Sequence, residues 1–92
     1  MTASFHDFEQ QGWERAADAY GDAFGPLTSQ TIPRVLAVAG VRAGSRLLDV
    51  ACGPGYVSAA ATALGATTLG VDFSREMVAI ASRAHPSLAF QD

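Results

Sequence analysis

The stretch Arg46-Leu-Leu-Asp-Val-Ala-Cys-Gly-Pro-Gly-Tyr-Val-Ser58 decides how the rest of this chain is interpreted. Its apolar first half is typical of a buried strand, and two closely spaced glycines, Gly53 and Gly55, then lead into a helical pattern. A strand, a tight turn and a helix N-terminus in this order let the backbone approach a nucleotide-like ligand. We expect a ligand site at this turn, with a purely structural tight turn as the alternative.

The composition excludes several classes of protein. The 92 residues are 49% hydrophobic and 16% charged, with a net charge of -3, which is typical of one small globular domain without a basic nucleic-acid footprint. No apolar run reaches the roughly 18 residues of a membrane span, and the N-terminus does not resemble a signal peptide, so we expect a cytoplasmic protein.

Cysteine and histidine usage predicts no metal site. Cys52 is the single cysteine, which excludes an intrachain disulfide and a cysteine-rich zinc site. No basic partner lies near it in the sequence, so we interpret it as a small turn residue rather than a nucleophile. His6 and His85 are too far apart in the sequence to suggest a metal pair.

Hydrophobic periodicity predicts alternating helices and strands. After a loose lead-in over residues 1–8, helical spacing predicts one helix over residues 9–24 and a second that begins between residues 28 and 32 and ends at Ala39. The following pattern predicts a strand over 47–51, a helix over 55–64, a strand over 67–71, a helix after the N-cap Ser74, and a strand opening at 88–91. This order predicts an α/β fold, the N-terminal βαβαβ half of a Rossmann-like, doubly wound parallel sheet preceded by two helices.

Asp49 and Asp72 are the two carboxylates expected at the site. Asp49 lies near the end of an apolar strand, where a charge is costly unless it is paired or faces a ligand; capping the N–H groups of the glycine turn is the alternative. Asp72 ends the next strand, 19 positions after Gly53, at the spacing of an acid that accepts hydrogen bonds from ribose hydroxyls. Its alternative role is to cap the following helix, although Ser74 already supplies a cap.

The turn departs from the dinucleotide-binding fingerprint at two positions. Ser58 stands where the third glycine of G-x-G-x-x-G would be, and Pro54 between the glycines has no N–H for a pyrophosphate. Both departures argue against a phosphate-containing ligand.

Apolar residues near the second strand-to-helix corner are candidates for holding an adenine. Phe73 lies at the helix entry and favours ligand contact, whereas Met77 lies on the inward stripe and fits the core equally well. Trp13 and Tyr20 share a helix face, and for Trp13 we favour a core position.

The motifs Leu48-Asp-Val-Ala-Cys-Gly-Pro-Gly55 and Gly70-Val-Asp-Phe-Ser74, followed by a helix containing Met77, resemble the class I S-adenosylmethionine-dependent methyltransferases. The most similar group is the one that includes small-molecule methyltransferases of the ubiquinone and menaquinone type. The resemblance covers about residues 39–91, and Trp13 to Tyr20 is similar to that group's N-terminal lid helix. It implies a helical lid or cap segment over residues 1–40 and the incomplete N-terminal half of the cofactor domain over residues 41–92.

The resemblance also implies roles for individual residues. Those expected at the methionine end of S-adenosylmethionine are Asp49, Ala51, Gly53 and Gly55. Asp72 would hold the ribose hydroxyls, Phe73 and Met77 would flank adenine, and Tyr20 would approach the methionine carboxylate or the acceptor. Asp92 is not expected to be the family's adenine-binding acid, which lies farther beyond a position like Phe90.

The implied function is methyl transfer to a small-molecule acceptor. Catalytic residues are not identifiable in this half, and we expect a C-terminal half or another chain to complete the sheet, because parallel sheets are normally covered on both faces. The alternatives are a nicotinamide-dependent oxidoreductase fragment and, if the polypeptide ends at residue 92, a non-catalytic binding or assembly module.

Overall fold

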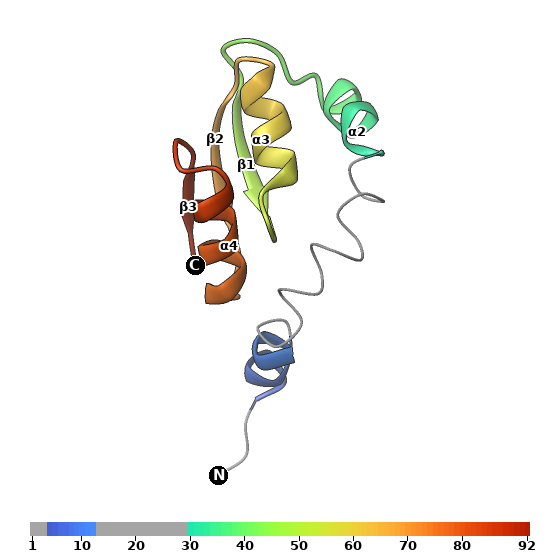
Figure 1. Cartoon of the computed structure of the whole chain (residues 1–92). Coiled ribbons are helices and arrows are strands. Elements are labelled where there is room, and N and C mark those ends of the chain that lie inside the picture. Colours follow the sequence, from blue (N-terminus) through green and yellow to red (C-terminus); the bar gives the residue numbers. More distant parts are fainter. Residues whose placement is uncertain (1–3, 13–29) are drawn as a thin grey trace.

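The computed structural model describes residues 4–12 and 30–92, and these form a three-stranded parallel sheet with helices around it (Figure 1). Residues 5–12 are helical. The remaining elements are α2 (Ile32–Ala39), β1 (Arg46–Val50), α3 (Tyr56–Ala63), β2 (Thr67–Val71), α4 (Arg75–Ala84) and β3 (Ala89–Gln91). The predicted α/β order is confirmed, with boundaries that differ by one or two residues.

The lead-in predicted over residues 1–8 is wrong in its second half, because the helix already includes residues 5–8. Ser4 explains this earlier start: its hydroxyl accepts a hydrogen bond from the N–H of Asp7 at 3.1 Å, which is the contact of a helix N-cap. Trp13 and Tyr20 lie outside the described residues.

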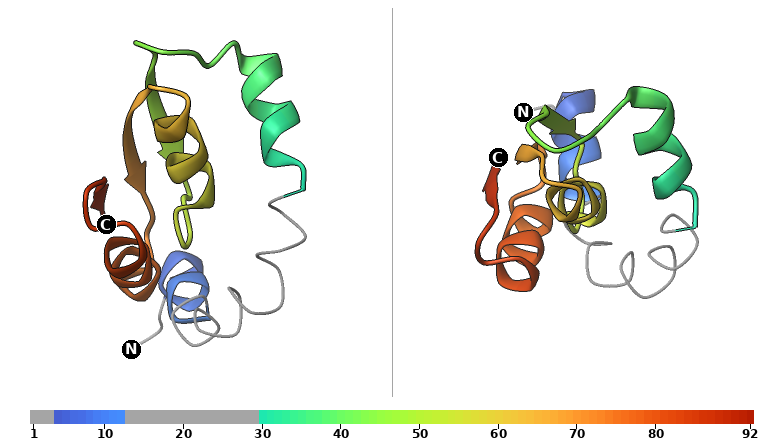
Figure 2. Two further views of the ribbon diagram at one scale, coloured as in Figure 1. Left: turned by 45° about the horizontal axis from the view of Figure 1, so that its top comes forward. Right: turned by 90° about the horizontal axis from the view of Figure 1, so that it is seen from above.

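The sheet has the order β1-β2-β3, and both neighbouring pairs are parallel. Asp49 is level with Gly70 and Gly70 with Phe90, so these three residues form one row across the sheet. Helices α3 and α4 lie on the same face of the sheet (Figure 2). This row therefore points toward the helices, as alternation along a strand requires.

The core lies between α2, α3 and the start of β1. Ile32 and Leu36 of α2 are buried against Ala61 of α3 and Ala66, with Leu47 packed at the margin. Because the alanines of α3 are small, the helix can approach its neighbours closely. Helix α2 ends at Ala39, as predicted, and Gly40 follows as a left-handed C-cap with a φ of 73°.

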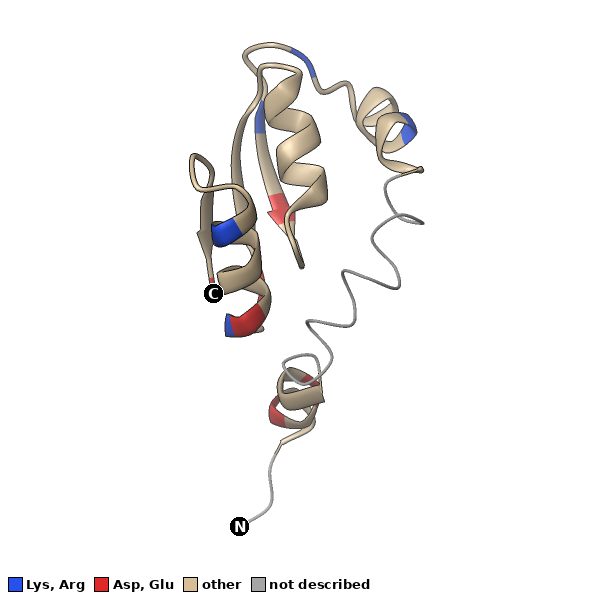
Figure 3. Cartoon of the chain, in the orientation of Figure 1, with Lys and Arg blue, Asp and Glu red and all other residues tan. Residues whose placement is uncertain are grey.

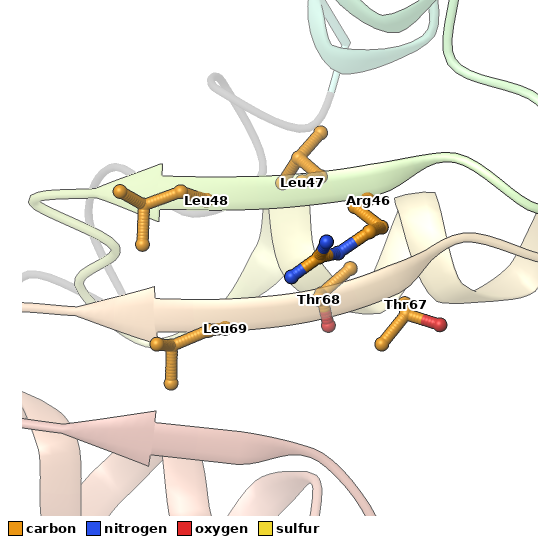
Figure 4. A pocket seen from close by; sticks show the side chains of 6 residues that line it. All are labelled: Arg46, Leu47, Leu48, Thr67, Thr68 and Leu69. Atoms are coloured by element: carbon orange, nitrogen blue, oxygen red, sulfur yellow. The ribbon is translucent and has the colours of Figure 1, made fainter.

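The opposite face of β1 is open. Leu48 is 60% exposed and Val50 is 69% exposed, although both belong to the apolar strand that was predicted to be buried. A hollow of about 380 Å³ lies along β1 and β2, and all six of its lining side chains come from these two strands (Figure 4). They are Arg46, Leu47, Leu48, Thr67, Thr68 and Leu69. None is acidic, and none belongs to the glycine turn.

Charge is divided along the sheet. Acidic residues gather at the carboxyl end of β1 and around the start of α4, where Arg75 also lies, whereas only arginines occur at the amino end of β1 and in the loop before it (Figure 3). The carboxyl ends of the strands therefore present a negative potential to a ligand. Among the described helices, none has the length and apolarity that crossing a membrane would require.

Candidate functional site

The glycine turn leaves the carboxyl end of β1 through three residues with positive φ. They are Ala51 at 57°, Gly53 at 54° and Gly55 at 90°, the last of which is the N-cap of α3. Glycine adopts this conformation without penalty, but Ala51 pays a cost of about 1–2 kcal/mol for it. The Cys52 N–H donates to the carbonyl of Val71 at 2.9 Å, which holds the start of the turn against β2.

Asp72 links the turn to the next strand. Its Oδ2 accepts the N–H of Gly53 at 2.9 Å, and its Oδ1 accepts the N–H of Ser74 at 2.9 Å. Ser74 separately caps α4 by accepting the N–H of Met77 at 3.2 Å. Each carboxylate oxygen has a second lone pair, so these contacts leave capacity for ligand hydroxyls. Asp72 therefore orders its own corner, and its predicted ribose role remains a prediction.

Asp49 forms a hydrogen bond with the Ser58 side chain and not with the N–H of Gly53 in the glycine turn. Asp72, and not Asp49, accepts the N–H of Gly53, so the idea that Asp49 caps this N–H is wrong. Asp49 instead accepts the hydroxyl of Ser58 on Oδ2 at 2.8 Å. Burial raises the pKa of the Asp49 carboxyl above its ordinary value of 3.8. Hydrogen bonds from the hydroxyl and the backbone N–H of Ser58 oppose this rise, and the nearby charge of Asp72 adds to it.

The turn offers a poor cradle for phosphate. The N–H of Gly53 donates to Asp72, the N–H of Gly55 donates to the Cys52 carbonyl at 3.1 Å, and Pro54 has no N–H. Two carboxylates next to the turn would also repel a phosphate. The structure thus strengthens the argument against a dinucleotide that Pro54 and Ser58 first suggested.

Two hollows meet at Ala51. One, of about 250 Å³, has Asp49 and Tyr56 in its wall and is closed on one side by α2. The other, of about 330 Å³, has Asp72 and Phe73 in its wall. Ala51 is in the wall of both, so the hollow with Asp49 in its wall and the hollow with Asp72 in its wall both border this residue. This fits the division into methionine and adenosine ends that the resemblance implies.

Met77 and Asp92 differ in whether they line a hollow, which the sequence did not decide. Met77 is 2% exposed and is not among the residues lining either hollow, so its expected contact with adenine remains a prediction. Asp92 lines the hollow of Asp72 and Phe73, and its Oδ2 lies 3.5 Å from Nε of Arg75.

The helix over residues 5–12 contacts the Phe73 corner, which the sequence did not predict. Gln10 donates its side-chain N–H to the carbonyl of Phe73 at 2.7 Å, and the His6 ring lies 5.5 Å from the Phe73 ring between centroids. Figure 2 shows this helix beyond the carboxyl ends of the strands. An N-terminal segment therefore borders the second hollow.

A glycine is needed at position 55 because a side chain there would clash with Phe90, and not only because a ligand needs space. A Cβ at Gly55 would lie 2.8 Å from Cζ of Phe90, and a Cβ at Gly70 would lie 2.6 Å from Cδ1 of the same ring. Phe90 thus packs over both glycines. The signal in the sequence is a glycine in the middle of β2, which suggests a close approach by another group.

Cys52 has the inert character predicted for it. It is 8% exposed, and burial, followed by the charges of Asp49 and Asp72, raises the pKa of its thiol to about 12. The thiol is therefore protonated at neutral pH and is a poor nucleophile. Within residues 4–12 and 30–92, no cluster of three or more His, Cys, Asp or Glu side chains could hold a metal ion.

Comparison with known proteins places this site in a family context. Residues 47–91 match the methyltransferase domain family. No curated protein sequence matches the chain.

Three solved structures illustrate the likeness. Phosphoethanolamine N-methyltransferase 2 of Haemonchus contortus, in complex with S-adenosyl-L-methionine, is 26% identical with a TM-score of 0.71, and the match covers 97% of this chain and 24% of that one. Magnesium protoporphyrin IX methyltransferase of Synechocystis, with S-adenosylmethionine bound, is 28% identical with a TM-score of 0.56, over 70% of this chain and 36% of that one. The YcgJ protein of Bacillus subtilis is 29% identical with a TM-score of 0.58, over 67% and 29%.

The chain thus spans only about a quarter to a third of the length of these structures. The matched segment contains the glycine turn, Asp49 and Asp72, and with them most of the wall of each hollow. Residues 47–91 are therefore similar to a methyltransferase domain, and the similar structures include two with S-adenosylmethionine bound.

Proposed function

We propose that this chain is the cofactor-binding part of an S-adenosylmethionine-dependent methyltransferase that acts on a small-molecule acceptor. The observation that carries the proposal is the acidic glycine turn. It combines two carboxylates with backbone N–H groups that are already bonded within the protein, and it is flanked by two hollows that share Ala51 in their walls. Such a site suits a cationic, phosphate-free nucleoside better than a dinucleotide.

The residues at the turn fit S-adenosylmethionine by their chemistry. Asp49 attracts the positively charged methionine end, and Asp72 accepts hydrogen bonds from the ribose hydroxyls. Phe73 provides an apolar surface for adenine. The bound cofactor would supply an activated methyl group, and the chain's own contribution is to orient it and to exclude water.

Tyr20 and Met77 complete the proposed cofactor site, together with Ala51, Gly53 and Gly55. We propose that residues 1–40 act as a helical cap over this site, which residues 41–92 build. The contact of Gln10 with Phe73 supports this division, because it brings the N-terminal segment to the edge of the Asp72 hollow.

We propose further that another α/β segment, in the same polypeptide or in a second chain, covers the open face of the sheet and supplies the acceptor site. The exposure of Leu48 and Val50 supports this, as does the small share of the similar structures that the chain spans. Intact-mass measurement of the protein purified from its source tests the idea. A mass equal to this chain alone, with no second chain copurifying, would contradict it. We also infer a cytoplasmic location, with which a free cysteine agrees.

Calorimetric titration with S-adenosylhomocysteine tests the cofactor assignment. The variants Asp72→Ala and Asp72→Asn should weaken binding at least tenfold, or about 1.4 kcal/mol, because ribose acceptors are lost. Glu76→Gln is the matched control, because it removes the same charge at the start of α4 from a residue that lines neither hollow. Saturable binding of NADH without binding of S-adenosylhomocysteine would instead support the oxidoreductase alternative.

A further inference from the structure

We propose that Ser58 is a positioning residue of the cofactor site, whose buried hydroxyl orients the Asp49 carboxylate at the wall of the first hollow. This inference rests on the proposed function, since it concerns how Asp49 is prepared for a cationic ligand. Ser58 itself is not among the residues that line either hollow, so its effect on a ligand passes through Asp49.

The geometry of the pair is defined by two different elements. Asp49 is the fourth residue of β1 and points toward the helices, while Ser58 is in the first turn of α3. Ser58 is 0% exposed, and its Oγ lies 2.8 Å from Oδ2 of Asp49. A buried hydroxyl that donates to a carboxylate makes a charge-assisted hydrogen bond, which is stronger than a neutral one and orients the carboxylate.

The electrostatic surroundings explain why Asp49 needs this donor. Burial and the charge of Asp72, which directly follows β2, both raise the pKa of Asp49, and the hydrogen bonds from the hydroxyl and the backbone N–H of Ser58 lower it, the hydroxyl more strongly. The other titratable groups near the hollow are Cys52, which is protonated, and Tyr56. Helix α2 contributes Ile32 and Val35 to this wall together with its N-cap Thr31, and none of the three carries a charge.

The identity of residue 58 therefore has a chemical meaning. A glycine there, as in the dinucleotide fingerprint, would have no hydroxyl to donate to Asp49. The serine departs from that fingerprint and supplies the donor. The serine in place of glycine at position 58 thus has two effects: it argues against a phosphate ligand, and it favours a fixed negative charge on Asp49 beside the turn.

The test compares Ser58→Ala with Thr62→Val. Thr62 is one turn later on α3, and its hydroxyl bonds that of Thr68 on β2 at 3.1 Å, so Thr62→Val removes a hydroxyl contact at the same helix–sheet interface without touching Asp49. The first readout is the carboxyl titration of Asp49 by NMR without ligand. The second is the affinity for S-adenosylhomocysteine between pH 5 and 8.

We expect Ser58→Ala to raise the pKa of Asp49 and to weaken S-adenosylhomocysteine binding roughly tenfold at neutral pH, which is the size of effect from a lost hydrogen bond to a charged group. The loss should deepen as the pH falls through the raised pKa. Thr62→Val should leave both readouts at the parent values, and Ser58→Thr, which retains the donor, should restore them. If Ser58→Ala folds incompletely by circular dichroism, Ser58→Cys, a weaker donor of similar size, provides the same comparison.

The possible outcomes distinguish a failure of the Ser58 positioning role from a failure of the proposed function. An unchanged Asp49 titration in Ser58→Ala, or an equal shift in Thr62→Val, would overturn the positioning role even if the parent protein binds S-adenosylhomocysteine. A shifted titration in a protein that binds no S-adenosylhomocysteine at any pH would overturn the proposed function, and with it the role of the pair toward a cofactor.

Discussion

The packing of Phe90 over the glycine turn leads to a quantitative prediction. Gly55 combines a φ of 90° with a Cβ position 2.8 Å from Phe90, Gly70 has the close ring contact without positive φ, and Gly40 has a φ of 73° with nothing within 4 Å of its Cβ position. Three Gly→Ala variants therefore separate backbone strain from the clash with the ring. Gly40→Ala measures strain alone, and Gly70→Ala measures the clash alone.

The expected costs follow from these environments. Left-handed backbone costs an alanine about 1–2 kcal/mol, and the less flexible unfolded chain returns about 0.4–1 kcal/mol, so Gly40→Ala should cost about 1 kcal/mol. Overpacking against a ring costs about 1–3 kcal/mol, which is the expectation for Gly70→Ala. Gly55→Ala should show both effects and lower the free energy of unfolding by about 2–4 kcal/mol.

Urea unfolding monitored by circular dichroism measures these values, with each variant made in the parent and in a Phe90→Leu background. The smaller leucine should relieve the clash, so Gly55→Ala should then cost about as much as Gly40→Ala. The interaction free energy between positions 55 and 90 should be about 0.5–3 kcal/mol. If Gly55→Ala costs no more than Gly40→Ala in the parent protein, the Phe90 ring does not restrict position 55.

Two further predictions concern titratable groups at the turn. Because the folded-state pKa of Asp49 is raised, its ionisation favours the unfolded state, and stability from this group is lost as pH rises from about 3.8 through the folded pKa. Asp49→Asn should therefore stabilise the fold against urea at pH 7 but not at pH 3, and an equal gain at both pH values would contradict this. The Cys52 thiol, with a pKa of about 12, should react with iodoacetamide at pH 8 far more slowly in the folded than in the urea-unfolded protein; equal rates would show that it is not protected.

One face of β1 is exposed, although the sequence predicts a buried strand. Leu48 and Val50 alternate with Leu47 and Asp49, so one face of the strand meets helices and the other meets solvent. The sequence shows an apolar run interrupted only by Asp49, which predicts burial on both faces. The difference arises because burial depends on which elements are present to cover each face, and this information is not local.

The sequence predicts which residues gather at the candidate site, but it does not predict the hydrogen bonds that they make. Asp49, Asp72 and Phe73 were expected at the carboxyl ends of the strands, and the structure places them in the walls of two adjoining hollows. Ser58 was recognised only as a missing glycine, and its bond to Asp49 was not expected. Met77 could be assigned equally to core or ligand from its helical spacing, and it is buried.

The order of elements, the turn at Gly53 and Gly55 and the acidic character of the site follow from the sequence alone, because hydrophobic period, glycine spacing and residue charge are local properties. Tertiary structure alone decided that Asp72 takes the Gly53 N–H, that Ser58 holds Asp49, and that Gln10 reaches Phe73. These contacts join residues 19, 9 and 63 positions apart, respectively. Their partners are chosen by the register of the strands and the placement of helices on the sheet, which no local pattern specifies.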